Sequence, residues 1–96
     1  MKKIPKMFKK YDYDFNLIKR VGNIAIYTQS KKGKIYAYEV HKIRIQKEHE
    51  IMINNQKALF KEMELLASAE YFGIYGWSFT NIQAALDKMG ELRIKG

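Results

Sequence analysis

The sequence has no cysteine, a single proline and no long apolar run, and these absences exclude several classes of protein. Without cysteine there can be no disulfide, no thiolate zinc site and no catalytic thiol. No apolar segment approaches the roughly 20 residues that a membrane-spanning helix needs. The basic start, residues 1–10, lacks the apolar stretch of a secretory signal. We therefore expect a soluble cytoplasmic protein without a membrane partner.

What the sequence does contain is enough apolar material for one small core. Its 96 residues are 47% hydrophobic and include seven Tyr, five Phe and one Trp. A chain of this length forms one domain, and this composition is too apolar for a wholly disordered protein. We expect a single α+β domain over residues 15–96, preceded by a basic arm over residues 1–14. The arm is interpreted as a mobile solvated tail, or else as two helical turns with one apolar stripe.

Charge is distributed unevenly along the chain. The formal net charge is +8, and residues 1–50 contain 13 Lys and Arg against 5 Asp and Glu, whereas residues 51–96 contain 5 of each. A surplus of cations concentrated in one half is typical of proteins that bind a polyanion, or a protein that carries one.

Alternating apolar residues predict a β-meander over residues 15–46. Gly22 and Asn23 suit a tight hairpin, because glycine supplies a positive φ. Residues 34–46 read as one long strand whose apolar parity changes midway, which predicts a β-bulge at His41 and Lys42. Residues 48–53 also alternate and end at an Asn-Asn turn. Residues 56–67 are ambiguous, since their spacing and composition favour a helix, whereas the turn favours a returning strand.

The last third of the chain carries clearer signals. Residues 68–73 predict one helical turn, and residues 75–79 alternate large and small side chains as a buried strand does. Thr80 and Gln83 have capping-box spacing, followed by the apolar stripe of a helix that we expect to end near Gly90. The predicted fold is α+β: an antiparallel β-meander of four to six strands with one C-terminal helix packed on one face.

Four features of the sequence form one recognisable pattern: residues 17–29, residues 38–40, the Phe-Gly-x-Tyr-Gly-Trp-x-Phe run of residues 72–79, and the closing helix. In these features the chain resembles a family of small phage and prophage proteins, mostly of unknown function. It implies that the region after the Asn-Asn turn returns as a β-hairpin, which we prefer to the helix. It also implies a host-cell setting, in which small phage proteins commonly bind a polymerase, nuclease, restriction enzyme or CRISPR effector.

The candidate binding residues are the cations of the predicted meander with one interleaved tyrosine. Lysine and arginine on a sheet would hold phosphates, and the ring of a tyrosine would stack on a base of a single strand. The alternative is a solvated face that serves only solubility. The set is Lys19, Arg20, Lys31, Lys32, Lys34, Tyr36, Lys42 and Arg44.

The sequence offers no convincing catalytic or metal site. His41 and His49 are its only histidines, and two histidines on predicted strands do not make three or four converging ligands. A His–Glu pair for acid–base chemistry is conceivable, but no nucleophile accompanies it. Trp77 is interpreted as part of a core strand rather than as an exposed contact. We therefore expect no enzyme, no cofactor and no metal.

Together these observations predict a non-enzymatic phage-type binding protein. Its basic half would engage RNA or DNA, or a host nucleic-acid-binding protein such as a CRISPR effector, and it would act as an inhibitor of a host defence nuclease. One alternative is a virion or assembly component that pairs through an exposed sheet edge. Another is a small DNA-binding regulator, which would discriminate between DNA sequences.

Overall fold

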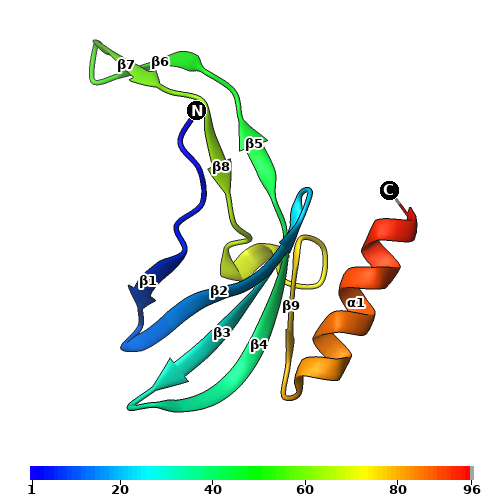
Figure 1. Cartoon of the computed structure of the whole chain (residues 1–96). Helices are drawn as coiled ribbons and strands as arrows, with labels where there is room; N and C mark the ends of the chain where they lie inside the picture. The colour runs from blue at the N-terminus through cyan, green and yellow to red at the C-terminus, as the bar shows by residue number, and fades with distance from the viewer. Residues whose placement is uncertain (96) are drawn as a thin grey trace.

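A twisted antiparallel sheet organises the computed structural model, which describes residues 1–95 (Figure 1). The strand order of the sheet is β1-β2-β3-β4-β9, and the helix α1 (Ile82–Lys95) packs on one of its faces. The predicted α+β class, with an antiparallel meander and one C-terminal helix, is confirmed. The five strands are β1 (Met7–Lys10), β2 (Tyr13–Val21), β3 (Ile24–Lys31), β4 (Lys34–Lys42) and β9 (Gly76–Phe79).

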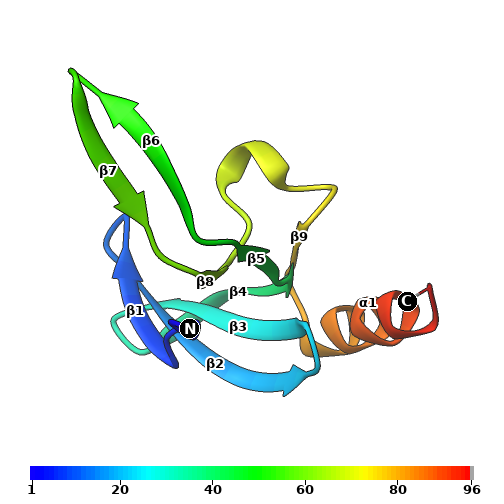
Figure 2. The ribbon, with the colours of Figure 1, turned by 90° about the horizontal axis from the view of Figure 1, so that it is seen from above.

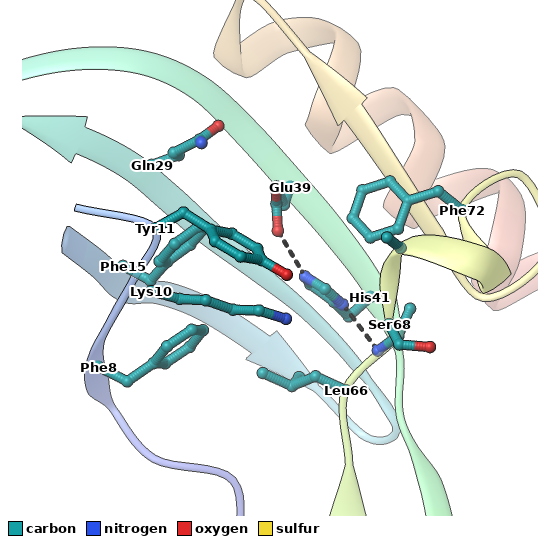
Figure 3. A pocket seen from close by; sticks show the side chains of 12 residues that line it. Phe8, Lys10, Tyr11, Phe15, Gln29, Glu39, His41, Leu66, Ser68 and Phe72 are labelled. Carbon is teal, nitrogen blue, oxygen red and sulfur yellow. Dashed lines mark hydrogen bonds and ion pairs between the residues drawn. The ribbon is translucent and has the colours of Figure 1, made fainter. Parts of the chain in front are cut away.

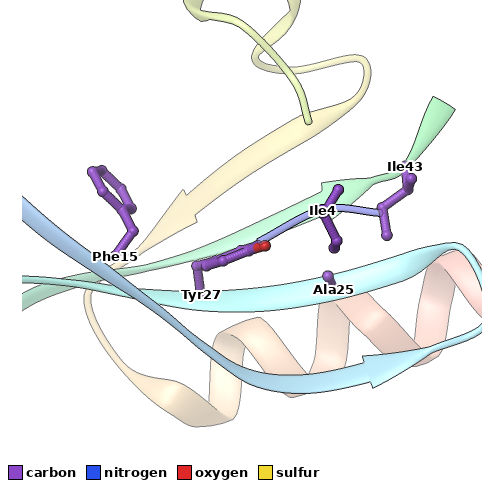
Figure 4. Close-up of a cluster of buried hydrophobic side chains, with 5 residues drawn as sticks. All are labelled: Ile4, Phe15, Ala25, Tyr27 and Ile43. Carbon is purple, nitrogen blue, oxygen red and sulfur yellow. The ribbon is translucent and has the colours of Figure 1, made fainter. Parts of the chain in front are cut away.

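The central strand β3 is buried on both sides of the sheet. Ile24 and Ile26 point to the helix face, where they pack with Ala85 and Met89 of α1. The alternate residues of β3 point to the opposite face, which we call the open face. There Tyr27 is fully buried in a second cluster, completed by Ile4, Phe15, Ala25 and Ile43 (Figure 4). The period-2 alternation of β3 therefore serves two cores rather than one.

The parity change in residues 34–46 has a different cause from the one predicted. Val40 packs on the helix face and Ile43 on the open face, so both parities are apolar without any extra residue. The predicted β-bulge at His41 and Lys42 is wrong. Instead β4 ends at Lys42 and the chain leaves the sheet as β5 (Arg44–Gln46). The register shifts of the sheet lie elsewhere, between Leu17 and Lys19 and between Gln29 and Ser30.

Residues 44–65 form one long, interrupted hairpin outside the main sheet. β5 pairs with β8 (Met63–Leu65), and β6 (His49–Ile53) pairs with β7 (Gln56–Phe60). The outer part, β6 and β7, projects away from the body of the protein (Figures 1 and 2). The hairpin prediction for this region is confirmed, and the helix that local propensity favoured is wrong. Asn54 and Asn55 both have positive φ, 51° and 63°, which turns the chain back on itself.

The N-terminal segment belongs to the domain, so the predicted separate arm over residues 1–14, whether mobile tail or helix, is wrong. β1 pairs along its whole length with β2, and Ile4 is 8% exposed within the open-face cluster. The Phe8 ring stacks on Phe15 with centroids 4.8 Å apart. Of the four apolar residues that suggested a helical stripe, Ile4 and Phe8 pack in the core, whereas Met7 and Tyr11 are 71% and 78% exposed.

The helix boundaries also differ from those expected. Asn81 rather than Thr80 caps the helix, since its Oδ1 accepts a hydrogen bond of 2.8 Å from the amide of Ala84. Gln83 bonds Asp87 one turn ahead instead of closing a capping box. The helix continues through Gly90 to its end. The predicted helical turn before β9 is present as a short 3-10 helix, η1 (Ala69–Tyr71).

An ion pair between the buried Glu64 and the partly exposed Arg20 ties the hairpin and the N-terminal segment to the sheet. Glu64 of β8 is 6% exposed, and its two oxygens accept hydrogen bonds of 2.8 and 2.6 Å from the Arg20 guanidinium. One of these oxygens also accepts the amide of Ile4 at 3.0 Å. These bonds to Arg20 lower the pKa of Glu64 from 4.5 to about 2, although burial opposes the shift. Beside them, burial raises the pKa of Tyr27 to about 12.

The first prediction concerns acid stability. Because the pKa of Glu64 is lower in the folded protein than the ordinary 4.5, its contribution is complete above about pH 5 and is lost as pH falls towards about 2. Urea unfolding at a series of pH values should show this loss. The Glu64→Gln variant should be less stable near neutral pH by roughly 2–4 kcal/mol, because Arg20 then loses its charged partner. It should also show a shallower acid dependence. If the free energy of unfolding of this variant fell between about pH 5 and pH 2 as steeply as that of the parent, the role given to Glu64 would be contradicted.

Candidate functional site

Two tight turns lie together at one end of the sheet. The antiparallel strand order brings the turn between β1 and β2 beside the turn between β3 and β4, and places the turn at Gly22 and Asn23 at the opposite end (Figure 1). Tyr11 and Asp12 both have positive φ, as do Lys32 and Gly33. This conformation gives the tight turns that join twisted antiparallel strands.

Lysines and tyrosines interleave beside these turns. The rings of Tyr13 and Tyr36 meet edge to face with centroids 5.8 Å apart. The ammonium group of Lys31 lies 5.6 Å from the centre of Tyr13, and that of Lys34 lies 5.4 Å from the centre of Tyr36. Tyr36 remains 49% exposed. We call this group the lysine–tyrosine surface, and it consists of Tyr13, Lys31, Lys32, Lys34 and Tyr36.

The structure brings together four of the eight predicted binding residues and separates the other four. Lys31, Lys32, Lys34 and Tyr36 belong to the lysine–tyrosine surface. The strand register places the other four elsewhere, since β2 and β4 run towards the opposite end of the sheet. These four are Lys19, Arg20, Lys42 and Arg44.

Two of the separated residues already have intramolecular partners. Arg20 holds Glu64, and this bond raises the pKa of the guanidinium further. Arg44 lies against two rings, 4.4 Å from the centre of Tyr71 and 4.7 Å from that of Tyr75. Both arginines therefore stabilise the packing of the hairpin and the η1 segment. Lys19 is exposed on β2, and Lys42 is partly buried at the end of β4.

A pocket of about 390 Å³ opens on the open face, next to the turn at Tyr11 and Asp12 (Figure 3). Apolar and aromatic side chains dominate its walls, with a few polar groups among them. Sequence reasoning missed it because its residues come from segments far apart in the chain, and no local spacing signals their convergence. The lining residues are Phe8, Lys10, Tyr11, Phe15, Gln29, Glu39, His41, Leu66, Ala67, Ser68, Ala69 and Phe72.

A hydrogen-bonded histidine and glutamate lie in this pocket. The amide of Ala67 donates to His41 Nδ1 at 3.1 Å, so Nδ1 is an acceptor and the proton of the neutral ring is on Nε2. Nε2 then donates to Glu39 Oε1 at 3.0 Å. His41 is 3% exposed, and its ring meets Tyr27 and Phe72 edge to face. The imidazole is fixed in one tautomer, and the carboxylate of Glu39 faces the pocket as an acceptor.

The two histidines lie in different parts of the fold. His49 lies in the projecting hairpin, where it stacks on Phe60 with centroids 5.1 Å apart. Within residues 1–95, no three His, Asp or Glu side chains converge as metal ligands would. Trp77 packs beside the helix-face cluster and the Lys88 ammonium lies 4.5 Å from the ring centre, so its interpretation as part of a core strand is confirmed.

Comparisons with protein-family models, with curated proteins and with solved structures found no match to this chain. The resemblance to phage proteins therefore stays a prediction. Among the helices that the structure describes, none is long and apolar enough to cross a membrane.

The second prediction tests the pocket wall with two glycine substitutions. A Cβ on Gly76 would come within 2.8 Å of the Ala67 Cβ and 2.9 Å of a Phe72 ring carbon, whereas a Cβ on Gly90 meets nothing. Gly76→Ala should lower the free energy of unfolding by about 1–3 kcal/mol through overpacking. Gly90→Ala, within the helix, should raise it by about 0.5–1 kcal/mol. Denaturant unfolding measures both. If the Gly76 variant were as stable as the parent, the pocket wall would be able to shift and accommodate the added methyl group without cost.

Proposed function

We propose that this protein is a non-enzymatic binding protein whose lysine–tyrosine surface engages single-stranded nucleic acid. The observation that carries the proposal is the convergence of three lysines and two tyrosines at one end of the sheet. Ammonium groups would neutralise successive phosphates, and the half-exposed ring of Tyr36 would stack on a base. The positive surplus of the chain supports the same partner, since it raises the local concentration of polyanions.

We further propose that the protein acts on a nucleoprotein of a host cell. The resemblance to phage proteins supports a role inside the host cell, as an inhibitor of a host defence nuclease such as an RNA-guided CRISPR effector. In that role the lysine–tyrosine surface would bind the nucleic acid that a host nucleoprotein carries, rather than a free strand. The chemistry of recognition, cations on phosphates and rings on bases, is the same in both cases.

The third prediction removes the cations of the lysine–tyrosine surface. The triple variant Lys31→Gln, Lys32→Gln, Lys34→Gln should bind labelled single-stranded RNA or DNA at least about tenfold more weakly at about 50 mM salt. Its logarithmic salt dependence should become shallower by about 2, because three phosphate contacts are lost. Fluorescence anisotropy at about 50 and 200 mM salt measures both quantities.

A matched control removes the same number of positive charges from residues outside the lysine–tyrosine surface. The variant Lys57→Gln, Lys61→Gln, Arg93→Gln removes three exposed cations from the neutral half of the chain. It should bind as the parent does. If both triple variants lose affinity equally, binding depends on net charge alone and the proposed surface is wrong. Duplex DNA in the same titration tests the regulator alternative, which expects the duplex to be preferred.

The projecting hairpin supports a second candidate function, assembly through copies of this chain. Ile51, Ile53 and Phe60 are 40%, 47% and 37% exposed, and the strand register places them with Ala58 on one apolar face. A two-stranded hairpin is marginally stable alone and gains stability when further strands or a surface cover it. Residues 47–62 hold three lysines and three glutamates, so two copies can meet here without the repulsion of their basic halves.

The fourth prediction tests this assembly. The variant Ile51→Thr, Ile53→Thr keeps strand propensity and removes both isoleucines from the apolar face. Sedimentation velocity should show the parent as a dimer or larger species and this variant as a monomer. The control, Ile18→Thr with Ile35→Thr, changes two isoleucines that are each 47% exposed on the main sheet, and it should sediment as the parent does. A monomeric parent would exclude the assembly function and leave the binding function untouched.

A further inference from the structure

The pocket lies next to the lysine–tyrosine surface, because Lys10, which lines the pocket, pairs with Tyr13 of that surface. Lys10 and Tyr11 line the pocket and belong to the turn that lies beside Lys31 and Lys34. Their side chains extend over the pocket in the direction of His41 (Figure 3). The Lys10 ammonium lies 5.2 Å from the centre of the Tyr11 ring, so the edge of the pocket repeats the pairing of cation and ring found on the surface. A strand bound on that surface would pass the mouth of the pocket.

The walls of the pocket suit a flat ring. Phe8 and Phe15 stack on each other with centroids 4.8 Å apart, so a base would lie against this pair and not between its rings, and the ring of Phe72 stands on the other side of His41. A volume of about 390 Å³ falls in the range of roughly 300–1,000 Å³ that small-ligand sites occupy. An unstacked base that leaves a single strand is commonly held between apolar and aromatic side chains.

The polar groups of the pocket determine which hydrogen-bond donors and acceptors a ligand must carry. Glu39 has one oxygen bonded to His41 and retains acceptor positions on both oxygens. Because His41 Nε2 already donates to it, the carboxylate presents acceptors and no donor. The ammonium of Lys10, which reaches over the same pocket, supplies a donor. A ligand that matches this pattern carries neighbouring N–H donors beside a carbonyl oxygen.

Guanine alone among the four common bases carries that pattern on its Watson–Crick edge. Its N1–H and N2–H₂ groups can both donate to one carboxylate, and its O6 lies where an ammonium can reach it. Adenine and cytosine place a ring acceptor next to their amino group, which the carboxylate repels. Uracil has one N–H between two carbonyl oxygens.

We infer that the open-face pocket binds an unpaired guanine of the strand held on the lysine–tyrosine surface, with Glu39 as the reader of its N–H groups. The inference rests on the proposed nucleic-acid function and adds base specificity to it. The backbone at Tyr11 supports it. A bulky residue at a φ of 53° is strained, and the tight turn there would favour Asn or Gly. A tyrosine at this strained position is explained by its place over the pocket.

The test compares four labelled RNA strands of about nine uridines, each with guanine, adenine, cytosine or uracil at the centre, a length within the usual footprint of such surfaces. The parent should bind the guanine strand about 5–100-fold more tightly than the others, as expected for a bidentate contact to a base. Glu39→Gln should erase this preference, since the amide keeps the bond from His41 but offers only one acceptor. Glu50→Gln, which removes an exposed carboxylate from the hairpin, should retain it.

The Tyr11→Asn variant separates binding from folding. This variant should bind the guanine strand more weakly than the parent does. Its melting temperature should be equal to that of the parent or higher, because asparagine suits the turn. Equal affinity of the parent for the four strands would overturn the guanine inference and leave the nucleic-acid function standing. Absence of binding to every strand would overturn both. Direct binding of a labelled short arginine peptide to the parent in the absence of RNA, lost in Glu39→Gln, would mean that the pocket takes a protein side chain, and would also overturn it.

Discussion

The bonds of the Glu64 carboxylate hold the open side of this protein together. One buried side chain joins β2 through Arg20, the N-terminal segment through the Ile4 amide, and its own strand β8 at the base of the hairpin. Apolar contacts of Ile4, Ile43 and Leu66 and the pairing of β1 with β2 attach the same segments alongside it. A charge inside the molecule is expensive unless it is paired and hydrogen-bonded, and here both conditions are met. The arginine that satisfies this charge is consequently unavailable to a ligand.

The pocket depends on that attachment. One of its walls is the sheet and the turn after β1, and the other is the segment 66–72 that follows β8. The amide of Ala67 in this segment fixes the tautomer of His41, so the position of the returning chain sets which proton Glu39 receives. The absent Cβ of Gly76 lets the same segment approach β9 closely. A structural ion pair, a glycine and a backbone amide thus define the chemistry of a site whose other side is built from surface lysines and tyrosines.

Much of the sheet could be predicted from the sequence because its signals are local. The alternation of Ile24, Ala25, Ile26 and Tyr27 predicts a strand with two apolar faces, and the turns at Gly22 and at Asn54 are determined by φ preferences alone. The parity change after β4 could not be interpreted correctly, since it depends on which segment covers each face.

The candidate site was predictable only in part for the same reason. Lysines close together in the sequence, Lys31 to Lys34, stay together in space, whereas Arg20 and Arg44 find partners that are distant in the chain. The basic N-terminal residues looked like a tail because the strand that receives them begins only at Tyr13. Nothing local marks Glu39 and His41 as neighbours of Phe8 and Phe72. Tertiary contacts of this kind, rather than propensity, decide where a pocket forms.

The hairpin begins where β4 ends, just after Lys42, whose amide donates to the carbonyl of Tyr75 at 2.8 Å, and its base is the pair β5 and β8. The outer strands β6 and β7 can therefore differ in length among related chains without disturbing the sheet, as surface excursions generally can. The register sets a rule for such variation. One residue added to each strand would exchange the two faces of the hairpin, whereas two added to each would restore the apolar face to its side. Lengths that differ by four residues are thus interchangeable in this arm, and intermediate lengths are not.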